Sequence, residues 1–449
     1  MRDFLPEDLR RREYVIGIIT RVYERYGFEP LETPAVENLD TLLGKYGDEG
    51  NKLIFKILKR GEHEATGQAD LALRYDLTVP LARVVAHHQA KLPRLFKRYQ
   101  IQPVWRADRP ARGRFREFYQ CDVDSLGSTS SVVEAELCAA VSDALVELGF
   151  REFRIRINHR RRLTSLLKAF GIADELHEAA LVAIDKLDRV GPDGVAVELE
   201  QRGISAESRT RFLAFHGLVS AGPNAVGATS SLEALDAAEG FLGPETMADA
   251  ANVSALENVR AILELTRSTS AEPRMCYDSF LARGLSYYTG AIMEVNVPDL
   301  AGSLGGGGRY DNLIGMFSGQ DIPACGFSLG LERILVVMTE RGMFPATLAM
   351  SPADIMVAMF DASTAAHAMR VADRLRACGL RVLVYPDADK LGKQIKYADG
   401  RGIPFVALAG DDEIRTGTVT VKDLAAQTQE THSESEAGAR ILEALKRRG

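Results

Sequence analysis

Residues 98–124 (RYQIQPVWRADRPARGRFREFYQCDVD) have the strongest chemical character in the sequence. Two extended runs flank a loop marked by Pro110 and Gly113, which predicts a hairpin with a long connection. Side chains alternate between the two faces of a strand, so residues two apart share a face. One face of the second run carries Arg116, Phe118, Gln120, Asp122 and Asp124, and one face of the first run carries Gln100, Gln102, Val104 and Arg106.

A sheet face that bears arginines, an aromatic ring, amides and acids is costly to bury unless its polar groups find partners. Such a face can form the floor of a site for a charged ligand, because arginine binds phosphate oxygens and an aromatic ring stacks on a base. The local charge agrees: residues 91–116 contain nine Lys or Arg and one Asp, although the whole chain has a net charge of −7. This concentration can bind a polyphosphate or an RNA acceptor end. The alternative is a solvated basic hairpin.

Two further segments contain candidate residues. In LARGLSYYTGAIMEV (residues 281–295), Arg283 lies among apolar residues near Tyr287 and Tyr288, although paired tyrosines are also typical of an ordinary half-buried strand. Residues 305–308 are four consecutive glycines, which let a backbone approach a ligand closely. They are not followed by GK[ST], so this is no Walker A loop, and such a run alone is typical of a tight turn.

The segment GFSLGLERILVVM (residues 326–338) predicts a strand that enters a helix at about Leu331. Arg333 then lies in the first helical turn, where a cation opposes the helix dipole by roughly 0.3–1 kcal/mol. A residue that contradicts a local rule is a candidate for a functional site. The alternative is an arginine whose side chain extends into solvent.

The elements that position these residues fall into several regions. A length of 449 residues predicts two or three domains. Residues 1–159 and 273–342 are β-rich and predict one domain, an antiparallel sheet that handles ATP or phosphate, while residues 160–272 predict a mostly helical insertion. Residues 343–353 contain Pro345 and Pro352 and predict a linker. Residues 354–449 alternate strand and helix, which predicts a small α/β domain, with QTQETHSESEAG (residues 427–438) as an exposed loop.

Composition bounds the cellular context. No apolar run reaches the roughly eighteen residues needed to span a bilayer, and the charged N-terminus lacks the apolar core of a secretion signal. The five cysteines are scattered and form no CxxC pair, which predicts reduced thiols. We therefore expect a cytoplasmic protein that does not bind a membrane.

In chain order, these segments resemble the signatures of the class II aminoacyl-tRNA synthetases. FEPLETPAVE, with Pro34, is similar to motif 1, the dimer-interface element; FKRYQIQPVWRADRPARGRFREFYQCDVD is similar to motif 2, and GFSLGLERIL to motif 3. ARGLSYYTG and GGGGRYDNLIGMF resemble the RGLDYYTG and GGRYDGL signatures of the histidyl-tRNA synthetases, and LALRYDLTVPLAR resembles their eukaryote-like branch. VLVYPDADKLGKQIKYADGRGIPFVALAG resembles the anticodon-binding domain of that family.

The resemblance implies an α+β catalytic domain on an antiparallel sheet of the class II type, with a helical insertion and a C-terminal α/β anticodon-binding domain. It implies a homodimeric histidine–tRNA ligase that uses ATP with Mg²⁺, L-histidine and tRNA(His). No metal ligand from the protein itself is expected.

The resemblance also implies roles for individual residues. For ATP, Arg106 would hold the α-phosphate, Arg333 the γ-phosphate and Phe118 the adenine, with Arg114 as a further ATP-binding residue. Arg283 would be the catalytic arginine, acting with Arg106. The residues expected to bind histidine are Asp76, Thr78 and Gln120 at the amino group, Asp124 and Tyr288 at the imidazole, and Tyr287 and Tyr310 beside them.

Two positions depart from the family pattern, because Ser286 and His159 stand where the family usually has Asp. The alternative function is a non-catalytic paralogue such as the synthetase-like regulatory subunit of ATP phosphoribosyltransferase. That paralogue lacks an anticodon-binding domain, whereas this chain has residues that resemble one. A pure RNA-binding or scaffold protein would not need Arg283 and Arg333 together with the polar face of the hairpin.

Overall fold

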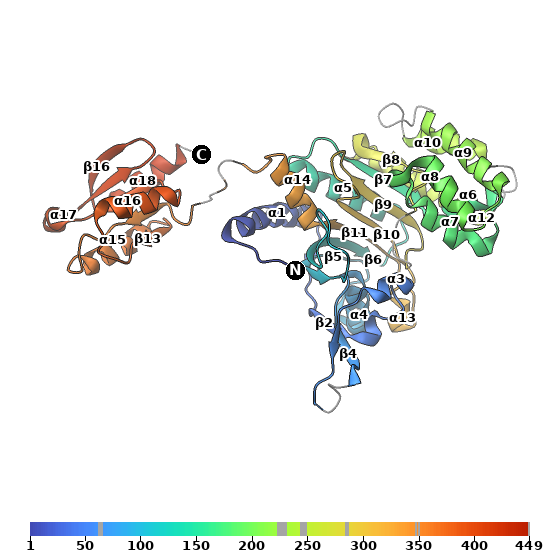
Figure 1. Ribbon diagram of the computed structural model, residues 1–449, viewed down its shortest axis with the longest axis horizontal. Coiled ribbons are helices and arrows are strands. Elements are labelled where there is room, and N and C mark those ends of the chain that lie inside the picture. Colours follow the sequence, from blue (N-terminus) through green and yellow to red (C-terminus); the bar gives the residue numbers. More distant parts are fainter. Residues whose placement is uncertain are drawn as a thin grey trace. The chain divides into compact units, whose positions relative to one another are not determined.

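The computed structural model of the chain describes residues 1–61, 66–221, 231–242, 249–282, 287–345, 348 and 351–447. The chain divides into two compact units. The first comprises Met1–Phe4 and Arg12–Met343, and the second comprises Leu5–Arg11 and Phe344–Gly449 (Figure 1). The predicted boundaries of the insertion and of the linker stay predictions.

An eight-stranded sheet organises the first unit, with the strand order β1-β5-β6-β11-β10-β9-β7-β8. Neighbouring strands are antiparallel except at the two edges, where β1 lies parallel to β5 and β8 parallel to β7. The strands are β1 (Glu29–Pro30), β5 (Phe96–Trp105), β6 (Glu117–Leu126), β7 (Arg154–His159), β8 (Met275–Tyr277), β9 (Ala291–Asn296), β10 (Gly305–Arg309) and β11 (Ala324–Gly330). The predicted antiparallel sheet is confirmed.

The hairpin predicted from residues 98–124 is formed by β5 and β6. Gln102 lies opposite Gln120 and Val104 opposite Phe118, so the polar faces of the two strands lie on the same side of the sheet. Beyond the strands, Arg106 N donates a hydrogen bond of 2.9 Å to Arg116 O, which closes the base of the connecting loop.

The four glycines do not form the tight turn that is typical of such a run. They belong to β10, which pairs with β9 on one side and with β11 on the other. The ladder bonds on both sides offset the low strand propensity of glycine. The neighbouring strands also approach closely: a Cβ atom on Gly307 would lie 2.1 Å from Gly326 O.

Helices α5 (Val132–Glu147) and α14 (Leu331–Glu340) pack on the central strands β6 and β11. Arg21 and Arg25, in the part of helix α1 (Pro6–Arg25) that belongs to the first unit, pair with Glu147 of α5. Most of α5 is buried, because α12 covers the side that faces away from the sheet. The predicted strand-to-helix transition is confirmed, since β11 ends at Gly330 and α14 begins at Leu331.

A group of helices lies between β7 and β8 in the chain and forms the predicted helical insertion (Figure 1). Its core contains the aromatic rings of Phe170, Phe212, Phe215 and Phe280, which pack with centroid separations between 5.4 and 6.0 Å. The elements of this region are α6 (Arg160–Ala169), η3 (Asp174–Leu176), α7 (His177–Ile184), α8 (Leu187–Gln201), α9 (Ala206–Ala221), α10 (Ser231–Phe241), α12 (Ala250–Thr266) and η4 (Glu272–Arg274).

A smaller antiparallel sheet, with the order β2-β4-β3, extends from the main sheet (Figure 1). Its core includes Leu42, Val79 and Leu313, from helices and turns around it. The elements here are β2 (Val36–Asn38), α2 (Leu39–Leu42), α3 (Gly47–Lys52), β3 (Lys56–Leu58), β4 (Ala69–Leu73), α4 (Thr78–His88), η2 (Gln89–Lys91) and α13 (Gly315–Ser318).

The second unit contains a five-stranded sheet with the order β13-β12-β14-β15-β16, parallel between its first three strands and antiparallel between the others. Ile355 and Val357 of β12 belong to one core cluster and Met356 to another, so both faces of this strand are buried. This explains why the strand is apolar throughout. The elements are β12 (Ile355–Val357), α15 (Ala365–Ala377), β13 (Val382–Val384), α16 (Leu391–Gly400), β14 (Phe405–Leu408), α17 (Asp411–Thr416), β15 (Thr418–Asp423), β16 (Thr428–Ser433) and α18 (Ala437–Lys446).

The prediction of an exposed loop at residues 427–438 is wrong. Residues Thr428–Ser433 form the edge strand β16, which pairs along its length with β15. Its side chains are mostly exposed, so its sequence lacks the apolar alternation that identifies a strand. Backbone hydrogen bonds to β15 stabilise it instead, which a polar segment can form as well as an apolar one.

Candidate functional site

A cleft of about 350 Å³ opens over the central strands of the eight-stranded sheet. Its lining comes from β6, β9, β10 and β11, from the loop between β5 and β6, from the start of α14 and from the turn before α4. Most of the residues predicted to bind ATP or histidine line this one cleft: Asp76, Thr78, Arg106, Arg114, Phe118, Gln120, Tyr287, Tyr288 and Arg333. Segments far apart in the chain therefore meet here.

Arg106 is held in place by two aromatic rings and a carbonyl group. Its guanidinium carbon lies 4.3 Å from the ring centre of Tyr75 and 5.2 Å from that of Phe118, and its Nε donates a hydrogen bond of 3.0 Å to Tyr75 O. Cation–π contacts and one hydrogen bond fix the plane of the group. Its remaining N–H groups are suited to phosphate oxygens.

Arg333 lies in the first turn of α14, as predicted. Its Nη1 donates a hydrogen bond to Ser303 O, in the segment before β10. The side chain therefore lies along the cleft, where it is among the lining residues. The helix dipole disfavours a cation at this position, so the location of Arg333 suits the binding of an anionic ligand more than the stability of the helix.

A second part of the cleft is acidic. Asp76 Oδ1 accepts hydrogen bonds from Tyr46 Oη at 3.0 Å and from Val79 N at 3.1 Å, and its Oδ2 accepts one of 3.0 Å from Tyr287 Oη. Burial raises the pKa of Asp76, and the hydrogen bond from Val79 and the nearby Arg106 act in the opposite direction. A carboxylate held this way suits a ligand ammonium group.

Asp124 and Tyr310 are not among the residues that line the cleft. Both are buried, and the Tyr310 hydroxyl donates a hydrogen bond to Asp124 Oδ1. Burial raises the pKa of Asp124, whereas Arg98 and Tyr310 lower it. The carboxylate fits only because residue 326 is glycine: a Cβ atom there would lie 1.9 Å from Asp124 Oδ1.

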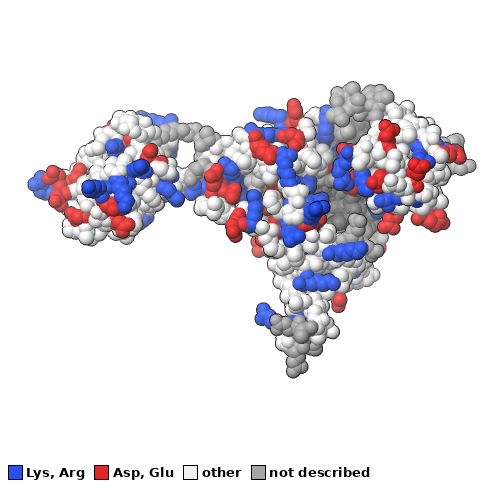
Figure 2. All heavy atoms as spheres, viewed as in Figure 1, with Lys and Arg blue, Asp and Glu red and all other residues white. Residues whose placement is uncertain are grey.

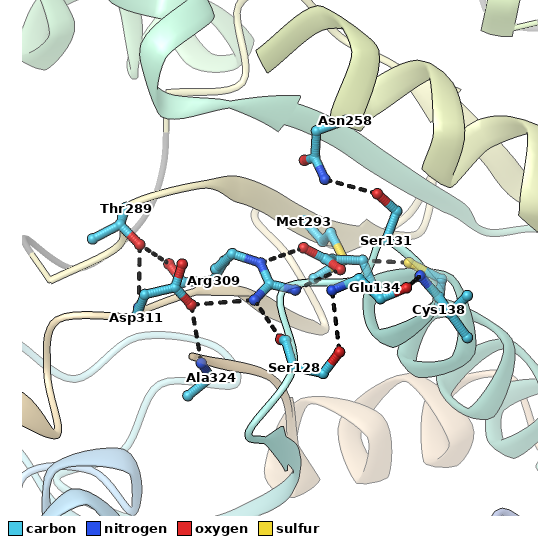
Figure 3. A network of polar contacts seen from close by, with 12 residues as sticks. Ser128, Ser131, Glu134, Cys138, Asn258, Thr289, Met293, Arg309, Asp311 and Ala324 are labelled. Atoms are coloured by element: carbon cyan, nitrogen blue, oxygen red, sulfur yellow. Dashed lines mark hydrogen bonds and ion pairs between the residues drawn. The ribbon is translucent and has the colours of Figure 1, made fainter. Parts of the chain in front are cut away.

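Arg309 and Glu134 form a buried ion pair that the sequence analysis missed. Arg309 Nε lies 2.6 Å from Glu134 Oε1 and its Nη2 lies 2.8 Å from Oε2, while its Nη1 donates to Ser128 O (Figure 3). Thr289 Oγ1 accepts a hydrogen bond of 3.2 Å from Asp311 N in the same network (Figure 3). The network thereby joins the residue after Tyr288 to the residues on either side of Tyr310.

One signal for this pair was present in the sequence. Glu134 is an acid within a helix that is otherwise almost wholly apolar on its buried positions, and Arg309 follows four glycines. A charged residue at a buried position needs a partner, but the sequence does not say which one.

Glu332 is a further missed residue that lines the cleft. Its Oε2 accepts a hydrogen bond of 2.9 Å from Tyr119 N, while its buried Oε1 has no hydrogen-bond partner in the described part of the chain. Burial raises the pKa of Glu332 to about 7. Glu294, from β9, also lines the cleft and is buried.

Of the two positions that depart from the family pattern, His159 lies within the described residues and Ser286 does not. His159 is the N-cap of α6, where its Nδ1 accepts a hydrogen bond of 3.1 Å from Arg161 N. Burial, followed by the charges of Arg161 and Arg162, lowers the pKa of His159 to about 4, so the ring is neutral and can cap the helix as Asp would. Arg283 and Ser286 lie outside the described residues.

The basic residues of 91–116 do not all face a ligand. Arg98 is fully buried, and Lys97 pairs with Glu136 at 2.9 Å. Figure 2 shows Lys and Arg interspersed with Asp and Glu on the visible face of each unit.

Among the described residues, no three or more His, Cys, Asp or Glu side chains are grouped to hold a metal ion. No described helix combines the length and apolar character that crossing a bilayer requires.

Comparison with protein families gives two matches. Residues 1–334 match the family described as histidyl-tRNA synthetase, and residues 354–444 match the family described as anticodon binding domain. The histidine–tRNA ligase of Christiangramia forsetii is 41% identical over 443 residues, which cover 94% of each chain. That of Gloeobacter violaceus is 40% identical over an alignment of 470 positions, which covers 99% of this chain and 98% of the relative.

Comparison with solved structures agrees. The histidyl-tRNA synthetase of a Nostoc species has a TM-score of 0.80 and 31% identity, and the match covers 100% of this chain and 98% of that one. A Bacillus halodurans structure, described as an ATP phosphoribosyltransferase regulatory subunit/histidyl-tRNA synthetase, has a TM-score of 0.70. At 22% identity, that second likeness shows a common fold alone.

Proposed function

This chain belongs to the histidyl-tRNA synthetase family, and on that premise we propose how its own residues carry out the ligase reaction. It is a histidine–tRNA ligase. ATP activates L-histidine to histidyl-adenylate with release of pyrophosphate, and the histidyl group is then transferred to the 3′ end of tRNA(His).

The observation that supports the assignment of the site is that one cleft contains both kinds of residue. Arg106, Phe118 and Arg333 lie in the same cavity as Asp76 and Gln120. Arginines suit a polyphosphate and buried carboxylates suit an ammonium ion, so the cleft can hold the two substrates side by side.

For ATP, we assign Arg106 to the α-phosphate and Arg333 to the γ-phosphate. Phe118, which the cation–π contact holds beside Arg106, stacks on the adenine. Arg114 lines the cleft in the loop between β5 and β6 and binds ATP from that side. Preorganised arginines stabilise the charge that develops during phosphoryl transfer without further reorganisation.

For histidine, we assign Asp76, Thr78 and Gln120 to the amino group and Tyr288 to the imidazole. Tyr287 supports this pocket through its hydrogen bond to Asp76. Asp124 and Tyr310 form a buried polar pair beneath it and are assigned to the imidazole end of the pocket. Polar partners select a ring that both donates and accepts hydrogen bonds, because a wrong amino acid leaves them unpaired.

In the first step, a carboxylate oxygen of histidine attacks the α-phosphorus of ATP. A new P–O bond forms, the bond to the β-phosphate oxygen breaks, and pyrophosphate leaves with that electron pair. Arg106 stabilises the charge on the α-phosphate. We assign the same role to Arg283, from its match to the family signature.

The use of ATP implies Mg²⁺, and the carboxylates of the cleft fit a hard cation that takes oxygen ligands. Glu332 offers a buried oxygen without a partner among the described residues, and Glu294 lines the same cavity. Although the sequence led us to expect no metal ligand from the protein, these two residues would hold the ion. When bound, Mg²⁺ neutralises phosphate charge and orients the pyrophosphate.

The second unit is proposed to bind the anticodon of tRNA(His), in keeping with the family match of residues 354–444. Lys390, Lys393, Lys396 and Arg401 flank or lie on α16, and Lys393 pairs with Asp389 at 2.8 Å. Phosphate contacts from such residues add salt-dependent affinity.

We further propose that the enzyme is cytoplasmic and that it acts as a homodimer. The resemblance of residues 28–37 to motif 1, the dimer-interface element, supports the homodimer.

Pyrophosphate exchange tests this function. We expect exchange between labelled pyrophosphate and ATP only when L-histidine and Mg²⁺ are both present, with no comparable exchange for any other amino acid. Exchange with another amino acid and none with histidine would contradict the assignment of substrate. A protein that binds histidine without exchange would instead support the regulatory paralogue.

A further inference from the structure

The amide of Gln120 is held in one orientation by two neighbours. Its Nε2 donates hydrogen bonds to Ser328 Oγ at 2.7 Å and to Asp122 Oδ1 at 3.3 Å. Its Oε1 is buried and accepts no hydrogen bond from any described residue. We propose that Asp122 is a positioning residue for amino-acid recognition: its carboxylate orients Gln120 so that the amide oxygen is left to accept from the ammonium group of the substrate.

The strand registers bring the three residues together. Gln120 and Asp122 are two apart on β6 and therefore share a face, and Ser328 lies directly opposite Asp122 on β11. Asp122 is 2% exposed, so no solvent competes for its oxygens. The inference rests on the proposed assignment of Gln120 to the amino group of histidine, and adds the residue that makes Gln120 an acceptor there.

The chemistry of the amide explains why an ionised Asp122 is required. A carboxylate only accepts hydrogen bonds, so it attracts the NH₂ end of the amide and repels the carbonyl end. A protonated or amidated residue 122 can donate as well as accept, and then both orientations of Gln120 are permitted. Only the ionised form keeps the NH₂ group of Gln120 turned away from the substrate. An NH₂ group in that place could not accept a hydrogen bond from the ammonium group, because both are donors.

The charges around Asp122 link its ionisation to ligand binding. The charged and titratable groups around it are Arg98 on β5, Cys121 and Asp124 on β6, Arg74 and Asp76 between β4 and α4, Tyr23 on α1 and Tyr288 before β9. Burial raises the pKa of Asp122 to about 7; Arg98 and Ser328 lower it, while Asp124 and Asp76 raise it further.

An ammonium group at Gln120 adds a positive charge close to these carboxylates. It therefore favours the ionised form of Asp122, and a proton is released as the amino acid binds. Because burial raises the pKa of Asp122, part of the free protein carries this carboxyl protonated near neutral pH. Histidine affinity should accordingly rise with pH between about 6 and 8, beyond any change due to the ligand itself.

Calorimetry on the full-length protein tests the inference with L-histidine as the ligand and no ATP. Titrations at pH 7 in buffers of different ionisation enthalpy measure the protons released. We expect Asp122→Asn to release fewer protons than the unchanged protein and to bind histidine about tenfold more weakly, with ATP affinity unchanged. Asp174→Asn, at an exposed acid in the insertion, is the matched control and should behave as the unchanged protein.

Kinetics provide a readout that a purely structural role would not move. In pyrophosphate exchange, Asp122→Asn should raise the histidine KM about tenfold, leave kcat within about twofold, and flatten the pH dependence of kcat/KM for histidine between pH 6 and 8. Equal proton release and equal histidine affinity in the variant and the unchanged protein would overturn the inference.

Two further variants keep the inference open to refutation. Ser328→Ala removes a hydrogen bond that lowers the pKa of Asp122, so the pH midpoint for histidine binding should move upward; an unchanged midpoint contradicts the inference even if Asp122→Asn does not fold. Gln120→Leu separates the two proposals. If it leaves histidine affinity intact, the assignment of the amino-group site is wrong, whereas a loss in Gln120→Leu without one in Asp122→Asn overturns the role of Asp122 alone.

Discussion

Arg98 Nη2 lies 2.8 Å from Asp124 Oδ2, and the two residues face each other directly across β5 and β6. Both side chains are buried, and the other oxygen of Asp124 accepts a hydrogen bond from Tyr310. The carboxylate is thereby held by a cation on one side and a hydroxyl on the other. A ligand imidazole that reaches this pair meets a fixed acceptor and not a mobile one.

Asp124→Asn should raise the histidine KM by about tenfold and leave the dissociation constant of ATP nearly unchanged. The substitution keeps the size of the side chain and removes the charge that favours an N–H-donating ring. Steady-state kinetics for histidine and calorimetry for ATP make the comparison within one protein. An unaltered histidine KM would place the imidazole elsewhere.

Glu134→Gln should lower the free energy of unfolding by about 3–5 kcal/mol, because it leaves Arg309 buried without its bidentate partner. The histidine KM should also rise, since the Arg309 network joins the segments that carry Tyr288 and Tyr310. Glu136→Gln is the control on the same helix: its pair with Lys97 is partly exposed and should contribute less than about 1 kcal/mol. Denaturant unfolding of the three proteins tests the difference, and equal losses would show that burial does not matter here.

His159 should make the protein less stable as the solution is acidified. The folded-state pKa of about 4 lies below the ordinary value near 6.5, so the unfolded chain binds the proton more tightly. The stabilisation is complete above about pH 6.5 and is lost as the pH falls towards 4. His159→Asn keeps a capping side chain without a titrating ring. The unfolding free energy of the unchanged protein should therefore fall relative to that of the variant as the pH is lowered over that range. A constant difference would mean that the ring does not titrate as inferred.

Arg283→Ala should lower the single-turnover rate of adenylate formation by about a hundredfold or more and weaken ATP binding far less. An arginine that stabilises the transition state contributes to the rate, whereas one that only binds ground-state ATP contributes to affinity. Arg283→Lys keeps the charge but loses the planar fork, and an intermediate rate is expected. Near-normal adenylate formation in the alanine variant would remove Arg283 from the catalytic set.

A chain that ends at Leu348 should fold and form histidyl-adenylate, because the residues assigned to ATP and histidine all precede it. Its kcat/KM for charging tRNA(His) should fall because tRNA binds more weakly. The affinity for tRNA that remains should depend less on salt concentration, because fewer phosphate contacts are made. Exchange and charging, measured side by side on both chains, separate the two activities. Equal charging by the two chains would show that the second unit does not bind the anticodon.

The sequence by itself was sufficient where a local rule applies. The alternation of side chains along a strand placed Phe118 and Gln120 on one face, and both line the cleft. The entry into a helix at Leu331 placed Arg333 in the first turn. These rules depend on neighbours a few residues away, so they can be read from the order of residue types.

Only the tertiary structure decided which polar residues meet across the sheet and which are buried. Arg98 belongs to a basic segment but lies inside, opposite Asp124; Arg309 finds Glu134 at a distance of 175 residues along the chain. The polar edge strand β16 and the glycine strand β10 are likewise specified by their partners and not by their own composition. The physical reason is that a backbone ladder or a buried ion pair is stabilised by what packs against it, and that partner is set by the fold of the whole unit.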